Sequence, residues 1–359
     1  MSGLYTGGGL VGGVGLFLLG MWMMTEGLKL SAGPQLEQML ARATRSRGRG
    51  LAAGVLVTAI VQSSSAVTVA TIGFVNAGLL NLSQALRVLF GANVGTTMTG
   101  WLVAVVGLKF KIEVLALPLV GLGMLLRVGG EAGRRGALSM ALAGFGVLFI
   151  GIATLRGTFA ELATTFRVPA VTQALDTLLQ VGVGVVLTVL MQSSSAALAV
   201  VLTAAQGGML PLHGAAAVVI GSNIGTTVTA LLAAIGATPN ARRAAAAHVL
   251  FNALTGGGAL LLLPWLVAAV GVLGGTLGMA PDIAANLALF HTTFNLFGVL
   301  LMWPLAERLT RFLERRFRTQ EEDEARPRFL DANVLSVPML ALGALDRELR
   351  RLGSLALRM

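Results

Sequence analysis

The chain has 359 residues, of which 55% are apolar and only 12% are charged, whereas soluble domains carry roughly a quarter charged residues. This composition argues against a water-soluble fold and predicts an all-α polytopic membrane protein, because apolar tracts recur along the sequence. The absence of cysteine excludes disulfides, thiolate metal sites and cysteine nucleophiles. The net charge of +10 is spread over predicted loops, which favours membrane orientation over a nucleic-acid partner.

Five stretches are long enough to cross a hydrocarbon core of about 30 Å as helices. These predicted spans cover residues 8–28, 113–128, 137–155, 246–270 and 284–305. Two other apolar stretches, 51–80 and 181–210, are too long for one upright helix and too short for two crossings. Each is predicted to be a re-entrant hairpin of two half-helices, which carries its serine-rich middle to the centre of the membrane.

An internal repeat relates the two hairpin regions. The segment Gln62-Ser63-Ser64-Ser65-Ala66 recurs as Gln192-Ser193-Ser194-Ser195-Ala196, and Gly91-Ala92-Asn93-Val94-Gly95-Thr96-Thr97 recurs as Gly221-Ser222-Asn223-Ile224-Gly225-Thr226-Thr227. Aligning 62–99 with 192–229 gives 16 identities in 38 positions without a gap. The second motif interrupts the spans 82–107 and 212–236, where two glycines around an asparagine predict local unwinding and therefore a broken transmembrane helix.

The order of the spans predicts two inverted-topology repeats. Three crossings separate the first serine run from the second, so the two hairpins are expected to enter from opposite faces, as in secondary transporters. The repeats are placed at about 8–130 and 137–270, and a final span at about 284–308 completes a transmembrane domain over 1–318. Fifteen Lys and Arg residues fall on the loops of one face and four on the other, which predicts a cytoplasmic C-terminus and an outside N-terminus.

The character of the chain changes after the last span. Residues 319–359 are predicted to contain a charged linker, with Glu321-Glu322-Asp323-Glu324 and Pro327, followed by an amphipathic helix over 334–358. A lone helix of this length cannot bury its leucine-rich face by itself. We therefore expect it to have a partner or to open a further domain.

The predicted centre of the membrane domain is almost free of charge. Arg87 is the only ionisable residue in 51–107, and His213 is the only one in 177–236. Hydroxyl, amide and carbonyl oxygens suit a sodium ion, and half-helix N-termini with serine hydroxyls suit an anion. Without a carboxylate, sodium coupling is favoured over proton coupling, and bound sodium ions would offset the charge of a multivalent anion.

The same residues allow three other interpretations. Serine and threonine in membrane helices often serve close packing, but the duplicated pair of motifs argues against that role alone. The segments 248–252 and 291–295 share a His-x-x-Phe-Asn pattern and are predicted to form hydrogen bonds between helices, with a direct role in ligand binding as the alternative. An intramembrane serine hydrolase that pairs a serine with one of these histidines lacks an oxyanion-hole element and an orienting acid, so no enzyme is expected.

The paired motifs, each a QSSS run followed by G-x-N-x-G-T-T, resemble those of the type II sodium-dependent phosphate cotransporters and their bacterial relatives. The resemblance implies that sodium and inorganic phosphate bind between the hairpin tips and the broken helices. It places phosphate mainly on Ser63, Ser64, Ser65, Asn93, Ser193, Ser194, Ser195 and Asn223. It places sodium mainly on Gln62, Thr96, Thr97, Gln192, Thr226 and Thr227.

The resemblance predicts a symporter of the bacterial inner membrane that imports phosphate by alternating access, with Na+ as the coupling ion and no organic cofactor. Transport of another anion such as sulfate, transport of a neutral solute, and a membrane phosphate sensor without net transport stay open as alternatives, as does a homodimer. The tail, with Leu330-Asp331, Pro338, Leu345, Glu348 and Leu349, resembles the first helix of a PhoU-like regulatory domain. A regulatory domain or protein of that kind is therefore an expected partner, besides phosphate, sodium and the lipid bilayer.

Overall fold

A computed structural model describes residues 2–33, 46–107, 113–128, 130, 133–165, 174–279, 282–317 and 338–356. Every regular element within these ranges is a helix, which confirms the all-α prediction. The contacts divide the chain into two compact units, Met1–Leu313 (unit 1) and Glu314–Met359 (unit 2).

The first half of unit 1 follows the predicted order. Its helices are α1 (Ser2–Ala32), α3 (Arg47–Val61), α4 (Ser64–Asn76), α5 (Leu82–Gly95), α6 (Thr97–Trp101), the π-helix η1 (Leu102–Gly107) and α7 (Glu113–Val128). The stretch predicted to be the first hairpin forms the pair α3 and α4. A capping box explains where α5 begins, because Asn81 and Gln84 each accept a hydrogen bond from the other's backbone N–H at 2.9 Å.

The second half of unit 1 contains nine helices within the described ranges. They are α8 (Gly133–Thr165), α9 (Ala174–Met191), α10 (Ser194–Gln206), α11 (Leu212–Gly225), α12 (Thr227–Ala233), α13 (Pro239–Leu261), α14 (Leu263–Thr276), α15 (Ile283–Met302) and α16 (Ala306–Glu314). The single span predicted over 246–270 is wrong, because the helix ends at Leu261 and a separate helix follows. The reason is Pro264, which has no backbone N–H to continue the first helix and instead lies in the first turn of α14.

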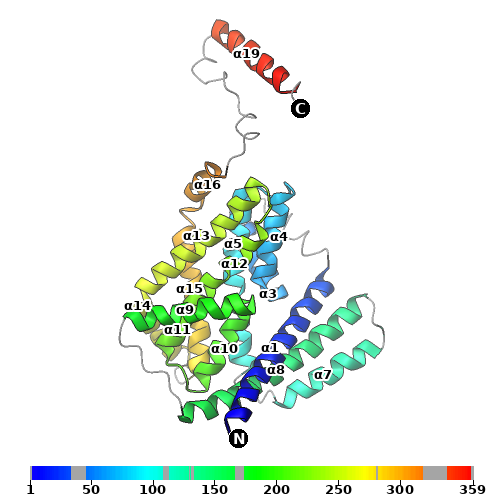
Figure 1. Cartoon of the computed structure of the whole chain (residues 1–359), viewed down its shortest axis with the longest axis vertical. Coiled ribbons are helices and arrows are strands. Elements are labelled where there is room, and N and C mark those ends of the chain that lie inside the picture. Colours follow the sequence, from blue (N-terminus) through cyan, green and yellow to red (C-terminus); the bar gives the residue numbers. More distant parts are fainter. Residues whose placement is uncertain are drawn as a thin grey trace. The chain divides into compact units, whose positions relative to one another are not determined.

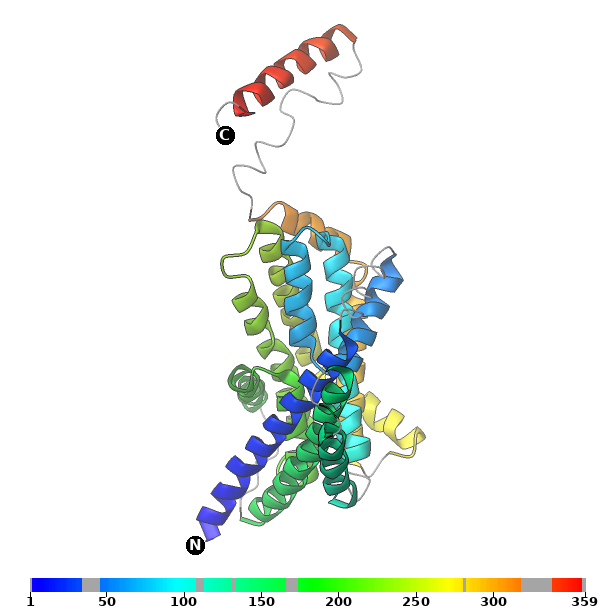
Figure 2. The ribbon, with the colours of Figure 1, turned by 90° about the vertical axis from the view of Figure 1, so that its right-hand side faces the viewer.

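Seven helical segments in the described part of the chain are long and apolar enough to cross a membrane. They are Thr6–Ala32, Leu82–Val105, Gly133–Thr165, Ala174–Met191, Leu212–Ala233, Pro239–Leu261 and Ile283–Met302. This finding confirms a polytopic membrane protein. The span predicted over 113–128 forms α7, whose 16 residues fall below that length, so this prediction is wrong. Helix α9 was predicted as half of a hairpin, but it has 18 residues and is long enough to cross. It lies crosswise to the upright α4 in Figures 1 and 2.

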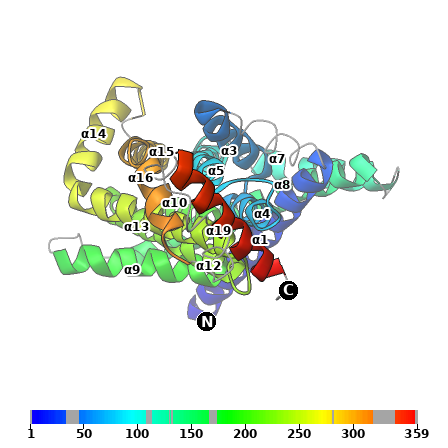
Figure 3. The ribbon, with the colours of Figure 1, turned by 90° about the horizontal axis from the view of Figure 1, so that it is seen from above.

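Unit 1 has two edges and a centre when it is seen from above (Figure 3). Helices α7 and α8 lie at one edge, α9 and α14 lie at the other, and α5, α10 and α15 lie between them. Helix α1 packs closely on α8 through glycines. A Cβ atom at Gly144 would lie 2.3 Å from the backbone nitrogen of Met24, so this approach is open only to glycine.

The two halves of unit 1 repeat one packing arrangement, in which α3 packs on α5 and α9 packs on α11. A Cβ atom at Gly54 would lie 2.2 Å from the Val88 carbonyl oxygen, and one at Gly184 would lie 2.0 Å from the Val218 carbonyl oxygen. Gly184 and Val218 each lie 130 positions after Gly54 and Val88, which is the spacing of the sequence repeat. In Figure 1, α4 lies in the upper part of unit 1 and α10 in the lower part. The inverted topology of the two repeats stays a prediction.

Unit 2 contains helix α19 (Pro338–Ala356) among its described residues. The leucines at 342, 345, 349 and 352 are exposed within this unit, as the predicted amphipathic helix requires. The buried Glu348 carboxylate forms an ion pair with Arg351. The predicted acidic linker and Leu335 lie outside the described residues, and the PhoU-like assignment stays a prediction.

Candidate functional site

The first QSSS segment forms the turn between α3 and α4 (tip 1, residues 62–65). Gln62 ends α3 in the left-handed region, with φ 58° and ψ 25°. Ser63 then begins α4, because its hydroxyl oxygen accepts the Ala66 backbone N–H at 3.2 Å. The serine run therefore places a helix N-terminus at the tip, where backbone N–H groups are available to an anion.

The second QSSS segment has the same local structure (tip 2, residues 192–195). Gln192 has φ 52°, and the Ser193 hydroxyl oxygen accepts the Ala196 backbone N–H at 3.2 Å. Among the described residues, Phe317 is the one other non-glycine with a positive φ. Because this conformation is unfavourable for a residue with a Cβ atom, its presence at both tips points to a functional constraint.

The G-x-N-x-G-T-T motifs interrupt a helix as predicted, but they do not unwind it. Helix α5 ends at Gly95 and α6 begins at Thr97, while Thr96 keeps right-handed helical angles of φ −63° and ψ −21°. The predicted unwinding is therefore wrong. The glycines are needed for close packing instead, because a Cβ atom at Gly91 would lie 2.1 Å from the Leu51 carbonyl oxygen.

The threonine hydroxyls of these motifs donate hydrogen bonds to backbone carbonyls at the point where the helix is interrupted. The Thr96 hydroxyl donates to the Asn93 carbonyl at 2.5 Å, and the Thr97 hydroxyl donates to the Val94 carbonyl at 2.7 Å. In the second motif Thr226 and Thr227 make the equivalent bonds, at 2.5 and 2.8 Å. A hydroxyl that donates its proton keeps its lone pairs, so these four threonines, which are among the six predicted sodium ligands, still present oxygen acceptors.

One buried hydroxyl brings the two tips together. The Thr99 hydroxyl donates to Gln62 Oε1 at 2.9 Å and lies 3.4 Å from the Ser195 hydroxyl oxygen. Thr99 is only 2% exposed, so tip 1, tip 2 and α6 meet away from the surface. Thr99 is not among the predicted site residues, although its identity with Thr229 in the repeat is a signal in the sequence that points to it.

The other predicted residues of the tips and interrupted helices also lie in the interior. Asn93, Asn223, Ser64, Ser194 and Ser195 are all buried, and Ser63, Ser65 and Ser193 are half-buried. Within the described ranges the hydroxyls of Ser64, Ser65 and Ser194 have no hydrogen-bond partner. These groups can therefore bind a ligand without breaking an existing bond.

The two tips differ in exposure and bonding. Gln62 is 6% exposed and bonded to Thr99, whereas Gln192 is exposed. Thr229, which corresponds to Thr99, donates instead to the Thr226 carbonyl of its own helix at 2.7 Å. Tip 1 is thus bonded through Gln62 to its interrupted helix, whereas Gln192 of tip 2 is exposed.

Helix α15, which lies outside the sequence repeat, contacts the site in addition to the two tips and the interrupted helices. Asn223 Nδ2 donates to Asn295 Oδ1 at 3.0 Å, and Trp101 Nε1 donates to the Thr292 hydroxyl at 2.9 Å. Helix α15 thereby contacts both interrupted helices. The predicted interhelical role of the second His-x-x-Phe-Asn segment is confirmed for Asn295.

The first His-x-x-Phe-Asn segment behaves differently. Asn252 and His248 bond to each other within α13, with Asn252 Nδ2 3.2 Å from His248 Nε2, so the predicted bond between helices is not found among the described residues. The interhelical contact there comes from Phe251, whose ring stacks on Phe90 of α5 at a centroid distance of 4.7 Å.

Comparison with known proteins identifies the chain's family. The family described as Na+/Pi-cotransporter matches residues 16–157 and 168–279, which is more than half of the sequence. The chain belongs to the Na+/Pi-cotransporter family. The resemblance inferred from the paired motifs is therefore confirmed.

Two bacterial relatives align with most of the chain. "Putative inorganic phosphate export protein YjbB" of Escherichia coli K12 is 30% identical over 349 residues, which is 96% of this chain and 62% of that protein. "Uncharacterized protein YqeW" of Bacillus subtilis is 32% identical over 308 residues, which is 83% of this chain and 94% of that protein. The chain thus spans less than two thirds of the length of the phosphate-export relative.

A mammalian relative matches over a short segment. "Sodium-dependent phosphate transport protein 2A" of Oryctolagus cuniculus is 46% identical over 55 residues, which is 15% of this chain and 9% of that protein. No solved structure matches the chain.

Proposed function

We propose that this member of the Na+/Pi-cotransporter family is a sodium-coupled symporter of inorganic phosphate. The observation that carries the proposal is the bridge from Thr99 to both serine-rich tips, at 2.9 and 3.4 Å. It joins the two duplicated motifs into one buried site with free hydroxyls. Family membership supports phosphate and sodium as its ligands.

The proposed division of the site follows the chemistry of its groups. The hydroxyls and amides of Ser63, Ser64, Ser65, Asn93, Ser193, Ser194, Ser195 and Asn223 would bind phosphate, because the two tips also present helix N-termini. The oxygens of Gln62, Thr96, Thr97, Gln192, Thr226 and Thr227 would bind sodium. No group of three or more His, Cys, Asp or Glu side chains that could hold a metal occurs among the described residues, so neutral oxygens would carry the cation.

Coupling of phosphate transport to sodium follows from the lack of charged side chains in the proposed site. A phosphate dianion buried among neutral groups is strongly disfavoured unless its charge is offset. Sodium ions bound beside it supply that offset, so the fully loaded site is the favourable one. The sodium gradient then drives phosphate inward, and the direction would reverse if the gradients were reversed.

The difference between the tips supports alternating access. In the present state Thr99 holds tip 1, while Gln192 of tip 2 is exposed. We expect the opposite state to exchange these roles, with Thr229 donating to Gln192 Oε1 and Thr99 turning to its own helix. Each tip would then be closed in one state and open in the other.

The proposal is tested by labelled phosphate uptake into proteoliposomes that contain the purified full chain. Uptake should require an inward sodium gradient and should be inhibited by unlabelled phosphate but not by sulfate. Uptake that ignores sodium would reject the coupling, inhibition by sulfate alone would reject phosphate as the substrate, and saturable binding without flux would favour a sensor.

Two serine substitutions test the assignment of the site. Ser64→Ala and Ser194→Ala should each lower uptake by about tenfold, which corresponds to the loss of one hydrogen bond to a charged ligand. Ser139→Ala is the matched control, because Ser139 is also buried but donates to the Gly136 carbonyl of its own helix at 2.7 Å. If all three variants lost activity equally, the QSSS serines would be packing residues.

A further inference from the structure

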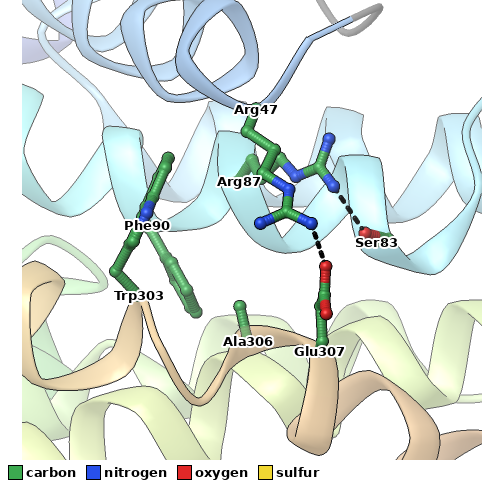
Figure 4. Close-up of a pocket in the computed structure, with 7 residues that line it drawn as sticks. All are labelled: Arg47, Ser83, Arg87, Phe90, Trp303, Ala306 and Glu307. Atoms are coloured by element: carbon green, nitrogen blue, oxygen red, sulfur yellow. Dashed lines mark hydrogen bonds and ion pairs between the residues drawn. The ribbon is translucent and has the colours of Figure 1, made fainter.

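A separate pocket lies between the start of α3, the first turns of α5 and the start of α16. It is lined by Arg47, Ser83, Arg87, Phe90, Trp303, Ala306 and Glu307, and we call it the arginine pocket (Figure 4). None of these residues belongs to the QSSS or G-x-N-x-G-T-T motifs. The pocket is therefore a distinct feature of the molecule.

The arginine pocket has an excess of positive charge. Arg47 forms an ion pair with Glu307, as Figure 4 shows. Arg87 Nη2 donates to the neutral Ser83 hydroxyl at 3.0 Å, and it forms no ion pair with an acidic side chain among the described residues. Two guanidinium groups thus share one carboxylate, which leaves one positive charge without a counterion from those residues.

Its position relates this pocket to the proposed transport site. Arg87 precedes Asn93 by six residues on α5, which corresponds to about 9 Å along a helix axis. Phe90 lies between them and stacks on Phe251, and each of these two side chains is 1% exposed. Phe90 also lines the arginine pocket, so the stacked rings form the side of the pocket that leads along α5 toward Asn93.

We propose that the arginine pocket is a second binding site for a phosphate group. It holds the transported anion on the face of the protein whose loops carry most of the Lys and Arg residues. This inference rests on the proposed function. Guanidinium groups suit this role because their planar N–H donors match the oxygens of phosphate. The Arg47 and Arg87 side chains would bind the anion, and the Ser83 hydroxyl would donate a further hydrogen bond.

Glu307 acts as a built-in competitor at this site. The pocket has about 20 Å³ of space for the centre of a water molecule, which is room for about one water, so phosphate enters only when Glu307 leaves Arg47. The side chains of Arg47 and Glu307 are 64% and 60% exposed. Ion pairs as exposed as this one are weak, so a dianion can displace the carboxylate.

The experiment measures binding of radiolabelled inorganic phosphate to the purified full chain in sodium-free choline buffer. The inner site requires sodium in our proposal, so this measurement isolates the arginine pocket. Arg87→Gln should weaken binding by about tenfold, the loss expected for a charged hydrogen bond. Glu307→Gln should tighten it by about two- to fivefold, because an exposed ion pair no longer competes.

Arg308→Gln is the matched control. Arg308 is exposed and follows Glu307 on the same helix, but it does not line the pocket. Its binding should equal that of the unsubstituted chain. Equal phosphate binding by the unsubstituted chain and the three variants, or weaker binding after Glu307→Gln, would overturn the proposal. Misfolding would weaken binding in both Arg87→Gln and Glu307→Gln, whereas the proposal predicts opposite changes in affinity for these two variants.

A lipid headgroup has the same phosphate chemistry, so the assay is repeated in two membranes. Phosphate affinity should be equal in bilayers of phosphatidylcholine and in bilayers that also contain phosphatidylglycerol. Loss of phosphate binding in the anionic bilayer would assign the pocket to lipid and overturn the proposal. Failure of sodium-dependent uptake by the unsubstituted chain would instead reject the proposed function, so the two failures are distinguishable.

Discussion

At the scale of single residues, Thr99 has the most demanding position in the site. It is 2% exposed, and it donates to a glutamine that is 6% exposed. Removal of the Thr99 hydroxyl would leave Gln62 Oε1 without this donor in the interior. Such a loss costs about 1–3 kcal/mol, and here it would fall on the contact that closes tip 1.

We expect Thr99→Val to lower sodium-driven phosphate uptake by about tenfold, because about 1.4 kcal/mol corresponds to that factor. Thr99→Ser keeps the hydroxyl and should retain most of the activity. Initial uptake rates in proteoliposomes, normalised to the amount of folded protein, measure both variants. Similar rates for the two variants would show that the hydroxyl has no part in transport.

The sequence could predict the residues of each tip, but not the contacts between them. The repeat identified Gln62 and Ser195 because both belong to a duplicated motif. Their shared contact through Thr99 depends on how the two halves pack, which no local pattern encodes. The same holds for Asn295, whose bond to Asn223 joins the repeat to a helix outside it.

At the scale of helices, the sequence analysis correctly singles out the glycines of the G-x-N-x-G-T-T motifs, but it assigns them the wrong role. Gly91 and Gly221 were predicted to loosen a helix, since glycine disfavours helical conformation. A Cβ atom at Gly221 would instead lie 1.9 Å from the Val181 carbonyl oxygen. A sequence alone does not distinguish these two uses of glycine, because both remove a side chain at the same position.

Helix α9 offers a matched test of glycine packing. A Cβ atom at Gly184 would lie 2.0 Å from the Val218 carbonyl oxygen, whereas one at Gly182 would have no atom within 4 Å. Gly184→Ala should lower the free energy of unfolding by about 1–3 kcal/mol through overpacking. Gly182→Ala should raise it slightly through better helix propensity.

Thermal unfolding of the two purified variants, measured in one detergent, checks this prediction. The midpoint temperature should fall for Gly184→Ala and stay the same or rise for Gly182→Ala. Equal shifts for the two variants would mean that α9 does not pack closely on α11 in the folded protein.

At the scale of the whole molecule, the two halves share a sequence pattern but differ in the exposure of their tip glutamines. The contacts of α3 with α5 repeat those of α9 with α11, while Gln62 is buried and Gln192 is exposed. In the alternating access that we propose, related halves would exchange such a difference between two states. The count of Lys and Arg residues cannot show the different exposure of the two tips, because those residues lie on the loops and not at the tips.

Cysteine labelling tests the exchange of states without interference, because the natural chain contains no cysteine. Without sodium or phosphate, a water-soluble maleimide should modify Gln192→Cys rapidly and Gln62→Cys slowly, since Gln192 is exposed and Gln62 is 6% exposed. If sodium and phosphate permit the opposite state, their addition should slow labelling at 192 and speed it at 62. Gln206→Cys, at an exposed position on α10, should react at a constant rate. Rates at 62 and 192 that stay unchanged, or that rise together, would contradict alternating closure of the tips.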